Sequence, residues 1–204
     1  AAPAPPPSER PHANARTSPD LSTPERDPLS KHKIPATRIR VPNKTYAFED
    51  KVYGQTSQNL SKLWGDFIVQ RADDVFAYQL AVVVDDDDMG VTEVVRGSDL
   101  LSSTPRQLYL QDVLGFSHPI YAHLPLLVAP DGRRLSKRNH DLDLGVLRDQ
   151  GKTPEEILGF LAYCIGLAEK EEPLSAVQVA NRFSWDVLRA HRKNVVVEHF
   201  SHVL

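Results

Sequence analysis

The sequence predicts an α/β domain followed by an α-helical C-terminal region. Residues 80–84 and 91–95 are continuous apolar runs, as expected of strands that a parallel sheet buries on both faces. In the last third of the chain, apolar residues recur at helical spacing between capping sequences and closing glycines. Hydrophobic residues make up 41% of the 204 residues, which is enough for a core.

Residues 1–33 are predicted to be a disordered, proline-rich segment. They contain eight of the sixteen prolines and neither a glycine nor an aromatic residue. Such a segment buries too little apolar surface to offset the entropy that it would lose on ordering. A polyproline ligand is the alternative interpretation.

The next part of the chain is predicted to form antiparallel strands and then the parallel sheet. Polar and apolar residues alternate over residues 37–41 and 45–50, and residues 66–71 are a third candidate strand. The buried strands 80–84 and 91–95 follow. Ligands bind beyond the carboxyl ends of parallel strands, where we expect Asp85, Asp86 and Arg96.

Helices are predicted on both sides of a short strand at residues 123–128. The first begins at an N-cap, Thr104, has Pro105 at its first position and a capping box completed by Gln107, and ends at Gly115. Later helices are expected over residues 142–150, from the capping box at Thr153 onward, over 176–180 and over 185–190. The helix after Thr153 carries one apolar face, made of Ile157, Leu161, Ile165 and Ala168.

Composition restricts the function classes. The net charge of −3 gives no global nucleic-acid signature. Cys164, the single cysteine, excludes an internal disulfide and a multi-cysteine zinc site, and it is expected to be a small core residue. No apolar run has the length of a membrane span, so we expect a soluble, cytoplasmic protein with no membrane partner.

A basic loop at residues 133–139 is the first candidate for chemistry. Lys137 stands among arginines directly after the turn at residues 129–132. A lysine ammonium there can neutralise charge that develops on a phosphate during phosphoryl or nucleotidyl transfer. An isolated loop of this kind is usually only solvated, so its context decides the interpretation.

Four segments in order supply that context: residues 76–86, 90–101, 103–107 and 134–138. Together they resemble the C-terminal part of the catalytic domain of glutamyl-type class I aminoacyl-tRNA synthetases, over about residues 37–185. The resemblance implies the second half of a Rossmann-like domain with a β-rich connecting segment at residues 34–132. A helical region with the ATP-signature loop would follow at residues 133–204, without an anticodon-binding domain.

Within that family the chain is most similar to the glutamyl-queuosine tRNA(Asp) synthetases. Gln79 follows Tyr78 as it does in that group, where ordinary glutamyl-tRNA synthetases usually have a histidine. The chain also ends 67 residues after Lys137 (204 minus 137), which leaves no room for an anticodon-binding domain.

The resemblance implies a reaction and a set of residues. Glutamate would attack ATP, bound with Mg²⁺, to give glutamyl-adenylate, and the glutamyl group would pass to queuosine in the anticodon loop of tRNA(Asp). Tyr78 and Arg96 match the glutamate-binding positions, which suits a carboxylate ligand because a guanidinium binds it in bidentate fashion. Lys137 matches the catalytic lysine of the ATP loop, which contains Arg134, Leu135, Ser136, Lys137 and Arg138.

Two features of the family are absent from the sequence. The histidine- and glycine-containing ATP motif and the zinc-binding cysteines should lie where the proline-rich segment stands. We therefore expect neither zinc nor another bound metal in this chain, and we expect the chain, a monomer, not to make glutamyl-adenylate alone. The alternatives are a truncated synthetase that charges the 3′ end of tRNA(Glu) and a non-catalytic remnant that binds RNA or a protein.

Structural roles remain the alternatives for several of these residues. Tyr78 fits a core aromatic, and Arg96 fits an ion pair with Glu93 or Asp99. The aspartates at residues 85–88 fit a solvated loop better than a Mg²⁺ site. Structural roles are expected for His118 and His123, whereas the cluster of Arg182, Arg189, Arg192 and Lys193 fits tRNA phosphate and an exposed basic helix equally.

Overall fold

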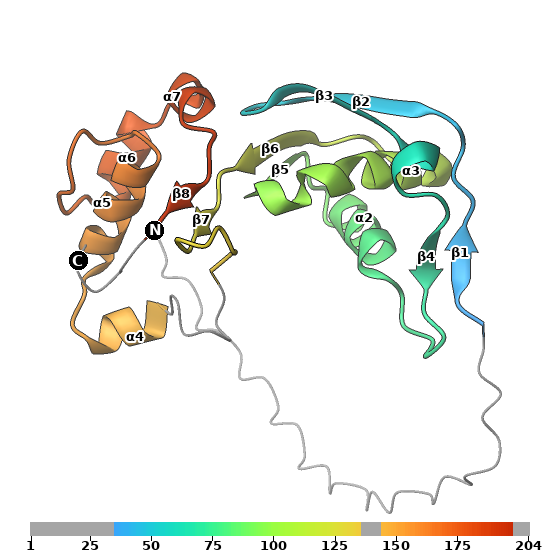
Figure 1. Ribbon diagram of the computed structural model, residues 1–204, viewed down its shortest axis with the longest axis horizontal. Helices are drawn as coiled ribbons and strands as arrows, with labels where there is room; N and C mark the ends of the chain where they lie inside the picture. The colour runs from blue at the N-terminus through green and yellow to red at the C-terminus, as the bar shows by residue number, and fades with distance from the viewer. Residues whose placement is uncertain (1–34, 136–143, 198–204) are drawn as a thin grey trace, which may run out of the picture. The chain divides into compact units, whose positions relative to one another are not determined.

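The computed structural model describes residues 35–135 and 144–197 (Figure 1). The segment predicted to be disordered, residues 1–33, lies outside the described residues. Ser136, Lys137 and Arg138 of the ATP-signature loop also lie outside them.

The largest sheet in the described residues has four strands in the order β3-β2-β6-β5. β2 (Thr45–Asp50) and β3 (Gly54–Asn59) form an antiparallel hairpin. β5 (Glu93–Gly97) and β6 (Ile120–Leu124) run parallel, with Arg96 opposite His123. β6 joins the hairpin where Tyr121 lies opposite Asp50, so the residue that ends β2 stands beside the parallel pair.

Two smaller sheets flank this one. β1 (Thr37–Ile39) pairs antiparallel with β4 (Phe67–Gln70). β7 (Leu127–Val128) pairs parallel with β8 (Val195–Val196), which ties the end of the described chain to its middle. The β-rich segment expected before the parallel strands is therefore confirmed, although β3 was not predicted because its sequence, GQTSQN, has no apolar alternation.

The prediction of a buried strand at residues 80–84 is wrong. These residues lie in α2 (Tyr78–Asp88), in which only Val83 is fully buried and Val84 is 40% exposed. A five-residue apolar run does not distinguish a strand from a helix by periodicity. The aspartates that follow therefore extend the helix, until Gly90 ends it at a φ of 67°.

α3 (Thr104–Leu114) follows a 3₁₀ segment, η1 (Ser98–Ser103). The capping box predicted at Thr104 is wrong, because Thr104 is itself helical and fully buried and Gln107 does not bond back to it. Both side chains turn toward Arg96 instead. Gly115 closes the helix in the left-handed conformation, as predicted.

The C-terminal region is helical, as predicted. It contains α4 (Leu144–Asp149), α5 (Pro154–Cys164), α6 (Ala176–Arg182) and α7 (Trp185–Ala190). A short α1 (Leu60–Leu63) follows β3. The strand predicted over residues 123–128 is divided into β6 and β7 at Pro125, which has no N–H to donate to a ladder.

Two hydrophobic cores hold these elements. The larger forms where α2 and α3 pack beside the central sheet and contains Val41, Tyr46, Leu60, Phe67, Val83, Leu108, Leu110 and Tyr121 (Figure 1). The smaller lies between α5, α6 and the loop that joins them and contains Ala162, Leu167, Ala168 and Leu174. The predicted apolar face was placed wrongly, because Ile165 and Ala168 lie beyond the end of α5, and Phe160 and Ala162 are its buried side chains.

The capping box at the start of α5 is confirmed. The Thr153 hydroxyl accepts a hydrogen bond from the Glu156 backbone N–H, and the Glu156 carboxylate accepts one from the Thr153 backbone N–H at 2.7 Å. These bonds hold the pKa of Glu156 below its usual value. None of the helices in the described residues is long and apolar enough to cross a membrane.

Replacing Thr153 by alanine is expected to lower the free energy of unfolding by about 1 kcal/mol, because it leaves the first turn of α5 without its hydroxyl acceptor. The measurement is urea-induced unfolding. Thr153→Ser, which keeps the hydroxyl, is the control and should unfold at nearly the wild-type midpoint. Equal stability of Thr153→Ala and the wild type would contradict the assigned cap.

Candidate active site

Arg96 lies near the carboxyl end of β5, where three acceptors hold its guanidinium. Nε donates to His123 Nε2 at 3.0 Å, and Nη2 donates to Thr104 Oγ1 at 2.8 Å and to Gln107 Oε1 at 2.7 Å. All three acceptors are buried. The alternative of an ion pair with Glu93 or Asp99 is wrong for the described residues, since neither carboxylate bonds to Arg96.

The third nitrogen of this guanidinium, Nη1, has no hydrogen bond among the described residues. Its two N–H groups are therefore the donors of Arg96 that a ligand could accept from. Burial lowers the pKa of Arg96, and the nearby Tyr121, Tyr78, Asp86 and Asp99 oppose that shift. An arginine stays protonated at neutral pH all the same. The site therefore offers a fixed positive charge whose Nη1 can donate to a carboxylate.

Tyr78 begins α2 and lies close enough to Arg96 to affect its pKa. Its side chain is 53% exposed, so the alternative of a core aromatic is wrong. The strand predicted at residues 80–84 is a helix, and Tyr78, its first residue, acts electrostatically on Arg96. The structure thus brings together the two residues matched to glutamate binding, and their role stays a prediction.

A chain of amides leads from Arg96 to α2. Because Arg96 donates to Gln107 Oε1, the Gln107 amide is oriented with Nε2 toward Gln79, whose Oε1 accepts at 2.9 Å. Gln79 Nε2 in turn donates to Ser103 Oγ at 3.2 Å, and Arg106 donates to the same hydroxyl. Gln79 therefore supports the arginine indirectly.

Behind Arg96 lies a buried pair that the sequence did not reveal as part of a site. His123 Nδ1 and Asp50 Oδ2 are 2.6 Å apart, and both side chains are fully buried. Burial alone would raise the pKa of Asp50. Hydrogen bonds from His123, Tyr53 and Val52 lower the pKa by more than burial raises it, so the net pKa is below the usual value. The available signal was the inward position of Asp50, which follows Tyr46 and Phe48 at a spacing of two.

The ATP-signature loop is described only in part. Arg134 forms an exposed ion pair with Asp99 of η1, and Leu135 is half-buried. An exposed pair of this kind contributes little to stability, so Arg134 can exchange Asp99 for an anionic ligand. The ion pair of Arg134 with Asp99 places the start of the loop beside Asp99, and Asp99 in turn acts electrostatically on Arg96.

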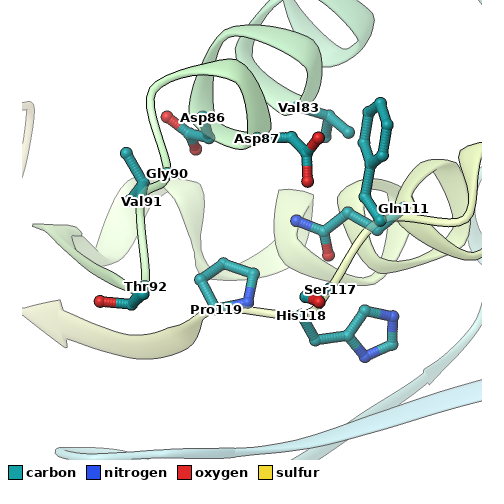
Figure 2. Close-up of a pocket in the computed structure, with 11 residues that line it drawn as sticks. Val83, Asp86, Asp87, Gly90, Val91, Thr92, Gln111, Ser117, His118 and Pro119 are labelled. Carbon is teal, nitrogen blue, oxygen red and sulfur yellow. The ribbon is translucent and has the colours of Figure 1, made fainter.

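Two of the four aspartates of α2 line a different cavity, a pocket of about 270 Å³ beyond the start of β5 (Figure 2). Asp86 and Asp87 lie on one side of it, and Gln111 lies between them and Ser117. Burial raises the pKa of Asp86. The prediction that these aspartates form a loop is wrong, and residues 35–135 and 144–197 contain no group of three His, Cys, Asp or Glu residues that could hold a metal ion.

The basic cluster near the end of the chain is partly engaged within the protein. Arg182 pairs with Glu172, and Arg189 bonds to Asp186 and to the Lys51 carbonyl. The structure leaves its role in binding tRNA phosphate a prediction. Cys164 is half-buried rather than a core residue, and burial raises the pKa of its thiol to about 11.

Residues 9–201 match the family described as "tRNA synthetases class I (E and Q), catalytic domain". A protein of Geobacter sulfurreducens named glutamyl-Q tRNA(Asp) synthetase is 56% identical over 112 residues, which are 55% of this chain and 36% of that protein. One of the same name from Symbiobacterium thermophilum is 45% identical over 163 residues, 80% of this chain and 50% of that protein. The chain thus spans half or less of the length of these relatives.

Solved structures agree with the fold. A glutamate tRNA ligase from Elizabethkingia meningosepticum, crystallised in complex with its amino acid, superposes with a TM-score of 0.64 at 25% identity. The match covers 78% of this chain and 35% of that one. A glutamate-tRNA synthetase from Elizabethkingia anophelis gives the same score over 79% of this chain and 36% of its own length.

Proposed function

Because the chain belongs to the catalytic-domain family of class I tRNA synthetases for glutamate and glutamine, we propose that it contributes to activating glutamate with ATP and transferring it to the queuosine of tRNA(Asp). The names of the similar proteins from Geobacter sulfurreducens and Symbiobacterium thermophilum support this acceptor. The structural observation that supports it best is Arg96, whose Nη1 has no hydrogen bond among the described residues and which lies near the exposed Tyr78.

Each residue of the site has a role in this proposal. Arg96 binds the side-chain carboxylate of glutamate through Nη1, and the Tyr78 hydroxyl adds a directed hydrogen bond. A hydrogen bond to a charged group contributes about 1.5–3 kcal/mol. Lys137 neutralises charge on the phosphates of Mg²⁺-bound ATP, with Arg134, Leu135, Ser136 and Arg138 forming the loop around them.

The chain alone is expected not to form glutamyl-adenylate, because it contains one of the family's two ATP motifs and spans half or less of the relatives' length. The measurement is ATP–pyrophosphate exchange with glutamate. A chimaera that joins the preceding part of the Geobacter sulfurreducens protein to residues 37–204 is the positive control and should exchange. Robust exchange by the purified chain would refute this prediction.

The same chimaera separates the proposed acceptor from the alternative, a truncated enzyme that charges tRNA(Glu), which the similarity to glutamate tRNA ligases favours. Labelled glutamate should appear on queuosine-containing tRNA(Asp), and not on tRNA(Asp) that lacks queuosine or on tRNA(Glu). Transfer to the 3′ end of tRNA(Glu) would support the alternative. Absence of activation by a folded chimaera would support a non-catalytic remnant.

A further inference from the structure

We propose that Asp50 and His123 form a buried positioning pair that fixes the guanidinium of Arg96 for the substrate carboxylate. The pair touches neither glutamate nor ATP in this scheme and acts only through Arg96. The inference rests on the proposed role of Arg96, and its first test does not depend on that role.

The first step is that Asp50 is held rigidly by the backbone. Its Oδ1 accepts hydrogen bonds from the backbone N–H groups of Val52 and Tyr53 in the turn of the β2–β3 hairpin, both at 3.0 Å. The backbone N–H of His123 reaches the same oxygen at 3.3 Å. Asp50 therefore joins the hairpin turn to the centre of β6, and only Oδ2 remains for a side chain.

The second step assigns the proton on His123. Arginine can only donate, so the 3.0 Å bond from Arg96 Nε requires a lone pair on His123 Nε2. The proton must then lie on Nδ1, where it is donated to Asp50 Oδ2 at 2.6 Å. A carboxylate that accepts from one ring nitrogen in this way fixes the tautomer and leaves the other nitrogen as an acceptor.

The third step connects this tautomer to the position of Arg96. Parallel pairing of β5 with β6 sets Arg96 opposite His123. The Tyr121 ring stacks on His123 with centroids 6.1 Å apart, and the guanidinium carbon lies 5.3 Å from the Tyr121 centroid. Because Nε and Nη2 donate to buried acceptors, the plane of the guanidinium is fixed. Nη1 is then the nitrogen that can donate to a ligand.

Asp50→Asn tests the tautomer directly, because the side chain keeps its shape and loses its charge. The asparagine amide N–H groups would face His123 Nδ1, which then must accept a hydrogen bond. The histidine proton therefore moves to Nε2, where it points at the Arg96 Nε–H and that hydrogen bond is lost. Nitrogen-15 NMR of the full chain, labelled at histidine and arginine, reports both effects. We expect an Nδ1–H tautomer in the wild type, an Nε2–H tautomer in the variant, and a changed Arg96 Nε–H signal.

Two replacements of His123 separate positioning from simple stability. His123→Asn keeps a donor for Asp50 and removes the acceptor for Arg96. His123→Gln keeps an acceptor near the Nε2 position and leaves Asp50 with its backbone donors alone. Positioning predicts weaker glutamate binding for His123→Asn than for His123→Gln, even where His123→Asn is the more stable protein. A purely structural role predicts instead that the more stable of the two variants binds glutamate more tightly.

Glutamate affinity of the same proteins, measured by NMR titration, completes the test. Asp50→Asn and His123→Asn should weaken binding about 10-fold or more, the effect of losing one hydrogen bond to a charged group. Asp66→Asn, at a carboxylate that bonds the Val41 backbone N–H, is the matched control and should bind as the wild type does.

Three results would overturn the proposal: an Nε2–H tautomer in the wild type, an unchanged Arg96 signal in Asp50→Asn, or wild-type glutamate affinity in a variant whose tautomer has inverted. If the wild type binds no glutamate, the proposed role of Arg96 fails. The histidine and arginine signals then still decide whether the pair positions Arg96.

Discussion

Replacing Arg96 by lysine is expected to weaken glutamate binding by about 10- to 100-fold, the effect of losing one hydrogen bond to a charged group. A lysine ammonium is a single point charge with three donors and cannot serve His123, Thr104 and Gln107 while it also donates to a carboxylate. Binding of glutamate to the full chain is the measurement, with far-ultraviolet circular dichroism to check folding.

Arg71→Lys is the matched control for this replacement. Arg71 forms an exposed ion pair with Asp73 within the turn after β4, so its replacement should leave glutamate affinity unchanged. Glutamate affinity of Arg96→Lys within a factor of two of the wild type would refute the proposed role of Arg96. Loss of binding in both variants would indicate an effect that is not specific to the site.

Replacing Gly159 by alanine is expected to destabilise the protein by about 3 kcal/mol, the upper part of the usual range for overpacking. A Cβ at this position of α5 would lie 1.8 Å from the Glu172 carbonyl oxygen. That backbone cannot move freely, because the Leu174 N–H bonds to the Glu155 carbonyl at 2.9 Å. Helix propensity alone predicts the opposite sign, a gain of about 1 kcal/mol for alanine.

Thermal unfolding checks this prediction, with an expected fall in Tm of roughly 6–12 °C, since 1 kcal/mol corresponds to about 2–4 °C in a protein of this size. Tyr163→Phe on the same helix is the control, because Tyr163 is 44% exposed and only its hydroxyl is lost, so stability should change by about 0.5 kcal/mol or less. A Tm for Gly159→Ala at or above that of the wild type would show that the segment at Glu172 does not pack against α5 as described.

Local sequence signals predicted the elements that depend on local chemistry. The Thr153 capping box and the left-handed Gly115 are set by residues within one turn of the chain, and both are confirmed. The apolar run at residues 80–84 failed because its length and composition fit a strand and a helix equally. The Thr104 capping box failed because Arg96, eight residues away in sequence, takes the hydroxyl.

The sequence by itself determined the α/β class and the helical C-terminal region, and it marked Tyr78 and Arg96 as candidate glutamate-binding residues, because these follow from local propensity and ordered motifs. Only the tertiary structure decided what surrounds Arg96. Asp50 and His123 are 73 residues apart, and neither carries a local signal of its partner. Sheet pairing brings them together, and their burial makes the hydrogen-bonding role of each atom obligatory.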